Sequence, residues 1–181
     1  MLQGVAFRVK NTASWASAGT VAMADSAKAD NIEWLRRQLG PQGRVMLFAH
    51  RDHLAGSGST IHMPPVFEHW RLPPMVGEVL RRRWAADMVS IAHFFAAESM
   101  GGETHHAGPS TIEGLLNQLP ADRLLLDLRT APAAVTEWLS RPHEFFGVPP
   151  WNTSVPAQAH DAVFFTRQAT PCSTDSEGHA A

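Results

Sequence analysis

The sequence has very little cysteine: one residue, Cys172, in a chain of 181. A single thiol excludes a disulfide within the chain and also excludes a cysteine-rich zinc module. The simplest setting for such a chain is a reducing compartment, so we expect a cytoplasmic location.

Long hydrophobic runs are also missing. No stretch approaches the roughly 18 consecutive apolar residues that a membrane helix needs, so we expect no membrane partner. The first residues lack a basic segment followed by a sustained apolar run, and therefore show no secretory signal. Apolar residues make up 44% and charged residues 18% of the chain, a balance that predicts a globular protein.

A strong charge of one sign is absent as well. The 15 basic and 17 acidic residues give a formal net charge of -2, whereas a nucleic-acid-binding domain needs a broad positive face. The densest basic cluster, residues 81–83, ends a predicted helix, where cations complement the helix dipole. We therefore expect no nucleic acid among the partners.

Alternating patterns predict an α/β fold, with a mostly parallel or mixed sheet flanked by helices. Ser110 and Glu113 have the spacing of a capping box, which would begin one of the helices. The predicted helices cover residues 25–39, 74–84, 110–119 and 132–139, and the predicted strands cover residues 44–49, 88–92, 124–128 and 161–166. Residues 51–73, rich in Gly, Ser, His and Pro, are predicted to be a long loop.

The domain is predicted to span residues 25–171 and to be incomplete at its N-terminus. Residues 1–24 offer only residues 5–9 as a short strand, although an α/β domain normally opens with its own strand and helix units. Exposed apolar surface and an open sheet edge are expected there, and association with another chain could cover them. Residues 172–181 are predicted to be a flexible tail.

His50 and His53 are the candidate site residues. They follow the apolar run 44–49 directly, and ligands of open α/β sheets bind outside the carboxyl ends of strands. Two imidazoles at such a place can supply a general base and a hydrogen-bonding partner, because histidine changes charge near neutral pH.

Two other interpretations of these histidines remain open. A histidine at the end of a strand is often only a polar cap, and a zinc site could recruit further donors. We expect neither metal nor cofactor, because the spacing differs from the helical H-E-x-x-H pattern and no cysteine pair supports it. Asp127 and Arg129 are interpreted as a local ion pair, and the tryptophans near helix ends as packing residues.

Five segments, in this order and spacing, resemble the erythromycin esterase family and its succinoglycan-biosynthesis-like relatives. They are Asp25-Ser-Ala-Lys-Ala-Asp-Asn-Ile-Glu-Trp-Leu35, Val45-Met-Leu-Phe-Ala-His-Arg-Asp-His53, Met75-Val-Gly-Glu-Val-Leu80, Leu124-Leu-Leu-Asp-Leu-Arg129 with Trp138-Leu139, and His160-Asp-Ala-Val-Phe-Phe165. The resemblance implies an ester or macrolide lactone substrate, hydrolysed by water that a histidine activates. His50 and His53 match the paired histidines of the family's A-H-N-x-H segment, whose asparagine is Arg51 here.

The family's Gly-Glu-x-x-His-Gly-like segment, which supplies the principal general base, has no counterpart in this sequence. The resemblance therefore implies the C-terminal half of the domain, a truncated hydrolase with part of the active site. The alternative is a non-catalytic ligand-binding or interaction module derived from the same fold, and a small histidine metalloprotein is a third possibility.

Overall fold

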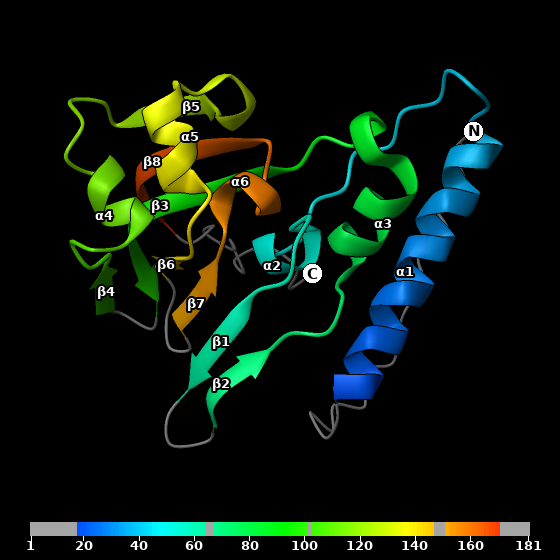
Figure 1. Ribbon diagram of the computed structural model, residues 1–181, viewed down its shortest axis with the longest axis horizontal. Helices are drawn as coiled ribbons and strands as arrows, with labels where there is room; N and C mark the ends of the chain where they lie inside the picture. The colour runs from blue at the N-terminus through cyan, green and yellow to red at the C-terminus, as the bar shows by residue number, and fades with distance from the viewer. Residues whose placement is uncertain (1–17, 64–66, 101–102, 147–150, 171–181) are drawn as a thin grey trace, which may run out of the picture.

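The computed structural model describes residues 18–63, 67–100, 103–146 and 151–170. Two four-stranded sheets lie next to each other in this part of the chain, and the long helix α1 (Ala18–Gln38) stands at one side of the molecule (Figure 1). No helix of the described residues is long and apolar enough to cross a membrane.

The larger sheet is mixed, in agreement with the α/β prediction. Its strands lie in the order β4 (Glu103–His106), β3 (Ile91–Met100), β8 (Ala162–Ala169) and β5 (Arg123–Asp127). β3 and β8 are parallel, whereas β4 and β5 are antiparallel to their neighbours. Helices α4 (Ile112–Leu116) and α5 (Ala133–Leu139) cover one face, over a core centred on Phe94 and Phe165.

The second sheet is entirely antiparallel, with the order β2 (Phe67–Arg71), β1 (Thr60–Met63), β7 (Trp151–Ser154) and β6 (His143–Phe145). Residues 51–73 are therefore not the long loop that we predicted, because they contain the β1–β2 hairpin and the short helix α2 (Arg51–Leu54). The composition of these residues did not indicate the hairpin, because its strand β1 is held by pairing with β7, a distant part of the chain.

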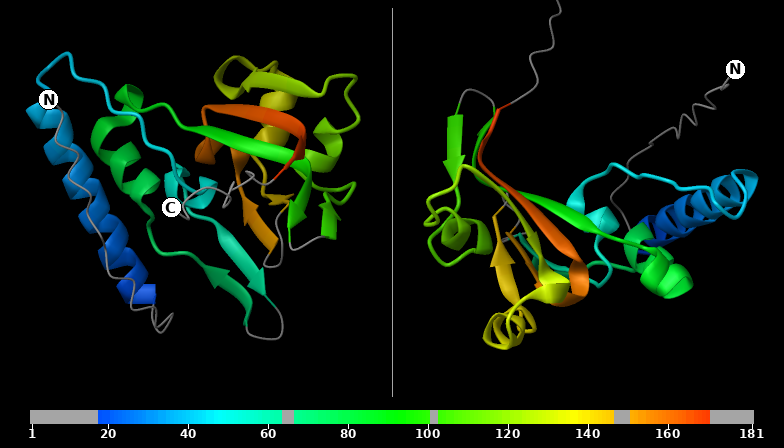
Figure 2. Two further views of the ribbon diagram at one scale, coloured as in Figure 1. Left: turned by 180° about the vertical axis from the view of Figure 1, so that it is seen from behind. Right: turned by 90° about the horizontal axis from the view of Figure 1, so that it is seen from above.

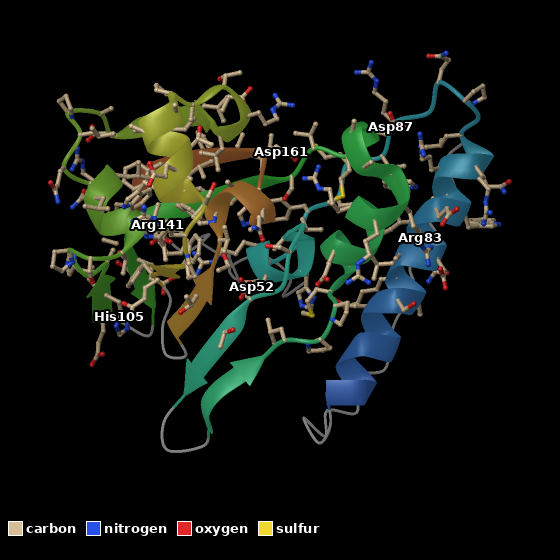
Figure 3. The ribbon with its side chains drawn as sticks, in the orientation of Figure 1. Asp52, Arg83, Asp87, His105, Arg141 and Asp161 are labelled. Atoms are coloured by element: carbon tan, nitrogen blue, oxygen red, sulfur yellow. The ribbon has the colours of Figure 1, made fainter. Side chains whose placement is uncertain are left out.

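Helices α1 and α3 (Val76–Trp84) pack together beside the sheets. Ala29 of α1 and Leu80 of α3 are both fully buried between them. Arg83 of α3 donates to Asp30 and Glu33 of α1, at 2.7 Å each, and Figure 3 shows its side chain beside α1. The helix predicted at residues 25–39 is confirmed, but it begins earlier, at Ala18.

Residues 44–49 do not form the buried strand that the sequence predicts. Val45 and Leu47 are half-buried, and Leu47 packs against the α1–α3 core, but Met46 is 95% and Phe48 99% exposed. No backbone hydrogen bond joins this segment to another described residue. The composition is that of a strand buried on both faces, while the strands that would flank it are not among the described residues.

The capping box predicted at Ser110 and Glu113 is also wrong. Thr111 caps α4 instead, and its Oγ1 accepts a hydrogen bond from the amide of Gly114 at 3.1 Å. Glu113 turns into the protein interior, where a distant arginine binds its carboxylate.

The other predicted elements lie close to their observed positions. The strand expected at residues 88–92 begins later, at Ile91, while β5, α5 and β8 fall where helix and strand were predicted. No pattern predicted the short helices α6 (Pro156–Ala159), η1 (Ala85–Asp87) and η2 (Leu128–Thr130). The predicted strand at residues 5–9 and the tail at 172–181 lie outside the described residues.

Candidate functional site

His50 and His53 lie on the same short helical turn, α2. His50 is the N-cap of this helix, and its Nδ1 accepts a hydrogen bond from the amide of Asp52 at 3.4 Å. The amide of His53 donates to the carbonyl oxygen of His50 at 3.0 Å. His50 stands at the start of this turn and His53 within it. Figure 3 labels Asp52 on the same turn.

His53 is paired with a buried carboxylate. Its Nδ1 lies 2.9 Å from Oδ2 of Asp25, a residue of α1 with no exposed surface. The same carboxylate accepts hydrogen bonds from the amide of Val76 at 3.0 Å and from Nζ of Lys28 at 2.6 Å. Burial opposes ionisation of Asp25, but the hydrogen bonds from His53, Lys28 and Val76 outweigh it and lower its pKa to about 2.

The pairing with Asp25 fixes which ring nitrogen of His53 is free. An ionised carboxylate accepts only, so Nδ1 of His53 carries the proton and Nε2 keeps its lone pair. The side chain of His53 is 35% exposed, which leaves the ring accessible. His50 differs, because its Nδ1 accepts a hydrogen bond from the amide of Asp52 at 3.4 Å and lies 3.6 Å from the carboxylate of the same residue; in the tautomer that accepts from the amide, Nε2 carries the proton.

Arg51 anchors α2 to the larger sheet. Its guanidinium donates to Oε1 of Glu113 at 2.9 Å and to the carbonyl oxygen of Phe146 at 2.8 Å. It also lies over the rings of Phe94 and Phe145, at 5.4 and 5.2 Å from their centroids. Burial raises the pKa of Glu113, and the charge of Arg51 opposes that rise. Arg51 is thus a structural residue here, with its donors directed inward.

A second set of contacts holds the end of α2. The carbonyl oxygen of Leu54 accepts a hydrogen bond from Oγ of Ser90 at 2.9 Å, and Ser90 also bonds Nδ1 of His160 at 3.1 Å. A Cβ atom on Gly77 would come within 2.4 Å of the Leu54 carbonyl oxygen, so only glycine allows α3 to approach α2 this closely. Burial lowers the pKa of His160 to about 4, which keeps this ring neutral.

Asp161, next to His160, joins α3 to the start of β3. It accepts a hydrogen bond from the amide of Ser90 at 2.7 Å and is paired with Arg81. Figure 3 shows Asp161 near the point where β3 begins. These contacts make the surroundings of α2 rigid on the side of the larger sheet.

Several predicted structural roles can now be compared with the structure. The ion pair of Asp127 and Arg129 is confirmed, with two contacts of 2.9 and 2.7 Å at the surface. The interpretation of the tryptophans as packing residues holds least well for Trp34, which is 52% exposed. His105 lies on β4, where Figure 3 labels it.

Two of the cavities in the described part of the molecule are well defined, and neither is lined by His50 or His53. One, of about 320 Å³, lies at the C-terminal end of α1 beside Trp84. The other, of about 310 Å³, is apolar and lies under α4 and α5. Among the described residues, no three His, Cys, Asp or Glu side chains are grouped as a metal site would need.

Sequence reasoning missed Asp25 and Glu113 as partners of the α2 residues. Asp25 begins the first segment of the family resemblance. A carboxylate on the apolar side of a helix could have indicated a buried polar partner. Glu113 gave no such signal, because its spacing from Ser110 suited a helix cap.

The geometry defines an α/β protein with a mixed sheet and a carboxylate-oriented histidine on a short helix. The chain belongs to the erythromycin esterase family, whose model matches residues 4–169. Comparison with curated protein sequences finds no match.

Three solved structures share the fold. A Bacillus cereus protein has a TM-score of 0.68 at 19% identity, over 88% of this chain and 41% of that one. A succinoglycan biosynthesis protein has a TM-score of 0.69 at 17% identity, over 83% and 39%. A histidine-to-asparagine variant of the erythromycin esterase EreC, in its open conformation, has a TM-score of 0.58 at 17% identity, over 82% and 37%. The chain therefore spans about two-fifths of the length of these relatives.

Proposed function

We propose that this chain carries part of the active site of an erythromycin-esterase-like hydrolase, with an ester or a macrolide lactone as substrate. The observation that supports this proposal is the pair of His53 and Asp25, in which a buried anion orients an accessible imidazole. Membership of the erythromycin esterase family supports the class of substrate.

In the proposed reaction His53 takes the role of general base, since the segment that supplies the family's principal base has no counterpart in this sequence. Its Nε2 takes a proton from a water molecule while the water oxygen attacks the ester carbonyl carbon. Asp25 is a positioning residue, because it holds the ring and stabilises the imidazolium that forms. The carbon–oxygen bond of the ester then breaks, the alcohol takes the proton back from His53, and a carboxylic acid is the second product.

His50 is proposed to act on the carbonyl oxygen. With Nδ1 engaged by the amide of Asp52, its Nε2–H can donate a hydrogen bond to the oxygen as negative charge develops there. Its side chain is 67% exposed, so this nitrogen can reach a bound ester. The two histidines thus have complementary roles, one accepting a proton and the other donating a hydrogen bond.

The test is hydrolysis of p-nitrophenyl acetate and of an erythromycin-type macrolide. The chain is assayed alone and together with the part of the Bacillus cereus protein that it does not cover. His53→Ala is expected to lower the rate by about 10²- to 10⁴-fold, the usual contribution of a general base. The control His143→Ala changes a half-buried ring that bonds the carbonyl oxygen of Trp138 at 2.7 Å and stacks on the Trp138 ring, away from α2, and should leave the rate unchanged. Equal rates for wild type and His53→Ala in both arms would contradict the proposal.

A second candidate is a non-catalytic module that binds a ligand near α2. It is favoured by Arg51, which replaces the asparagine of the family's segment and has its donors committed to Glu113 and Phe146. Calorimetry with a macrolide separates the two candidates. Binding without turnover, retained in His53→Ala, would support the module and contradict the hydrolase.

A further inference from the structure

Residues 44–49 form a segment without regular secondary structure, whose backbone is not paired with any described strand. No hydrogen bond from these amides and carbonyl oxygens reaches another described residue. The exposed edge of a strand is a template for pairing with another segment, and proteins normally cover or interrupt such edges. Here the segment contains no proline, and its one charged residue, the exposed Arg44, stands at its start, so residues 45–49 present an apolar edge.

After Arg44, the side chains of this segment are apolar on both faces. Leu47 packs toward α1 and α3, while Met46 and Phe48 project into solvent, 95% and 99% exposed. A strand that is apolar on both faces is typical of the interior of a sheet covered on both sides. The described residues cover only the face that carries Leu47.

The larger sheet has an uncovered face as well. Leu125, Phe164 and His93 lie side by side across β5, β8 and β3, as the strand register places them. Leu125 is 65% and Phe164 39% exposed, and Ile91, on the same face of β3, is 55% exposed. A face that includes a parallel pair of strands is normally buried under helices.

Residues 44–49 lie away from the face of the larger sheet that α4 and α5 cover. Helices α4 and α5 pack on the inner face of the sheet, through Ile112 and Leu139. Seen from above, α5 and the segment leading into α2 lie on opposite sides of β3 (Figure 2, right). The unpaired segment and the bare sheet face therefore both lie away from α5, where one partner could cover them together.

We infer that residues 44–49 are a docking strand for the part of an erythromycin-esterase domain that the solved relatives have in addition to the matched part. The solved relatives share this fold over 82–88% of the present chain, yet these matches take up only 37–41% of their own length. This additional length is the partner that we infer, and the inference requires it to provide an apolar strand that pairs with residues 44–49 and helices that cover Leu125 and Phe164. Docking places the partner directly before His50, at the start of the proposed active site.

The experiment mixes the chain with the part of the Bacillus cereus protein that it does not cover, produced as a separate polypeptide. Light scattering is expected to show a one-to-one complex. Hydrogen exchange is expected to show the amides of residues 44–49 unprotected in the free chain and protected in the complex. This binding experiment contains no substrate. If the complex forms but hydrolyses no ester in the separate assay described above, only the proposed function is contradicted.

Phe48→Lys is the matched variant, because a side chain that is 99% exposed contributes little to the fold of the free chain. We expect an unchanged melting temperature for the free chain and a Kd for the fragment raised by about 10- to 100-fold, from the loss of one buried aromatic side chain. The control Val135→Lys changes a residue of α5 that is 45% exposed, away from the docking strand, and should leave the Kd unchanged.

Three results would overturn the inference. They are the absence of any complex, a complex in which residues 44–49 stay unprotected, and an equal effect of Phe48→Lys and Val135→Lys. Self-association of the free chain with residues 44–49 already protected would also overturn it, since a second copy would then occupy the strand.

Discussion

Replacing Asp25 by Asn should remove a pH-dependent contribution to stability. The carboxylate of Asp25 is fully buried and accepts hydrogen bonds from Nδ1 of His53, Nζ of Lys28 and the amide of Val76. Its pKa falls from an ordinary value of 3.8 to about 2, which corresponds to about 2 kcal/mol of stabilisation of the ionised form. A lowered pKa in the folded state stabilises the protein above the unfolded-state value, and this stabilisation is lost as the pH falls toward 2.

The assay is urea denaturation of wild type and Asp25→Asn at pH 7 and at several values down to the lowest pH at which both fold. At pH 7 the variant should be less stable by about 2 kcal/mol, and the difference should shrink by about half near pH 3. Asp30→Asn is the control, because Asp30 lies on the same helix with a side chain that is 63% exposed. A stability difference between wild type and Asp25→Asn that stays constant from pH 7 to pH 3 would refute the role assigned to the carboxylate.

Three further changes test other contacts, each by urea denaturation. Arg51→Met should cost about 3–5 kcal/mol by leaving the carboxylate of Glu113 buried and unpaired, and Arg51→Met with Glu113→Leu should recover part of this; a cost under 1 kcal/mol would contradict the pairing. Because burial lowers the pKa of His160 from 6.5 to about 4, its neutral form is favoured, and wild type should lose about 2 kcal/mol between pH 7.5 and pH 5; an equal loss in His160→Gln would count against this cause. Thr111→Ala should cost about 1 kcal/mol and Ser110→Ala almost nothing, and the reverse order would restore the capping box.

Local patterns predicted the parts of the fold that local forces determine. Helical periodicity and the following Gly40 predicted the end of α1, and a continuous apolar run predicted β8 around Phe165. The pattern at residues 44–49 was equally strong, but pairing depends on neighbouring strands, which the described residues do not include. The prediction of a loop at the β1–β2 hairpin was wrong for the opposite reason. Pairing with β7 compensates there for a composition that is typical of loops.

The candidate site was only half predictable. His50 and His53 could be selected from their place after an apolar run, and the structure does bring them onto one helical turn. Their partners come from distant segments: Asp25 from α1, which packs against α3, and Glu113 from α4 under the sheet. Such contacts depend on tertiary packing, and one sequence carries no record of which carboxylate meets which ring.

The most direct test of the account is the tautomer of His53, measured by nitrogen NMR of the labelled, neutral imidazole. The account predicts a proton on Nδ1 and an unprotonated Nε2 in the wild type, because Nδ1 faces the ionised Asp25 at 2.9 Å. In Asp25→Asn this preference should weaken or reverse. A wild-type His53 with its proton on Nε2 would contradict the arrangement on which the proposed hydrolysis depends.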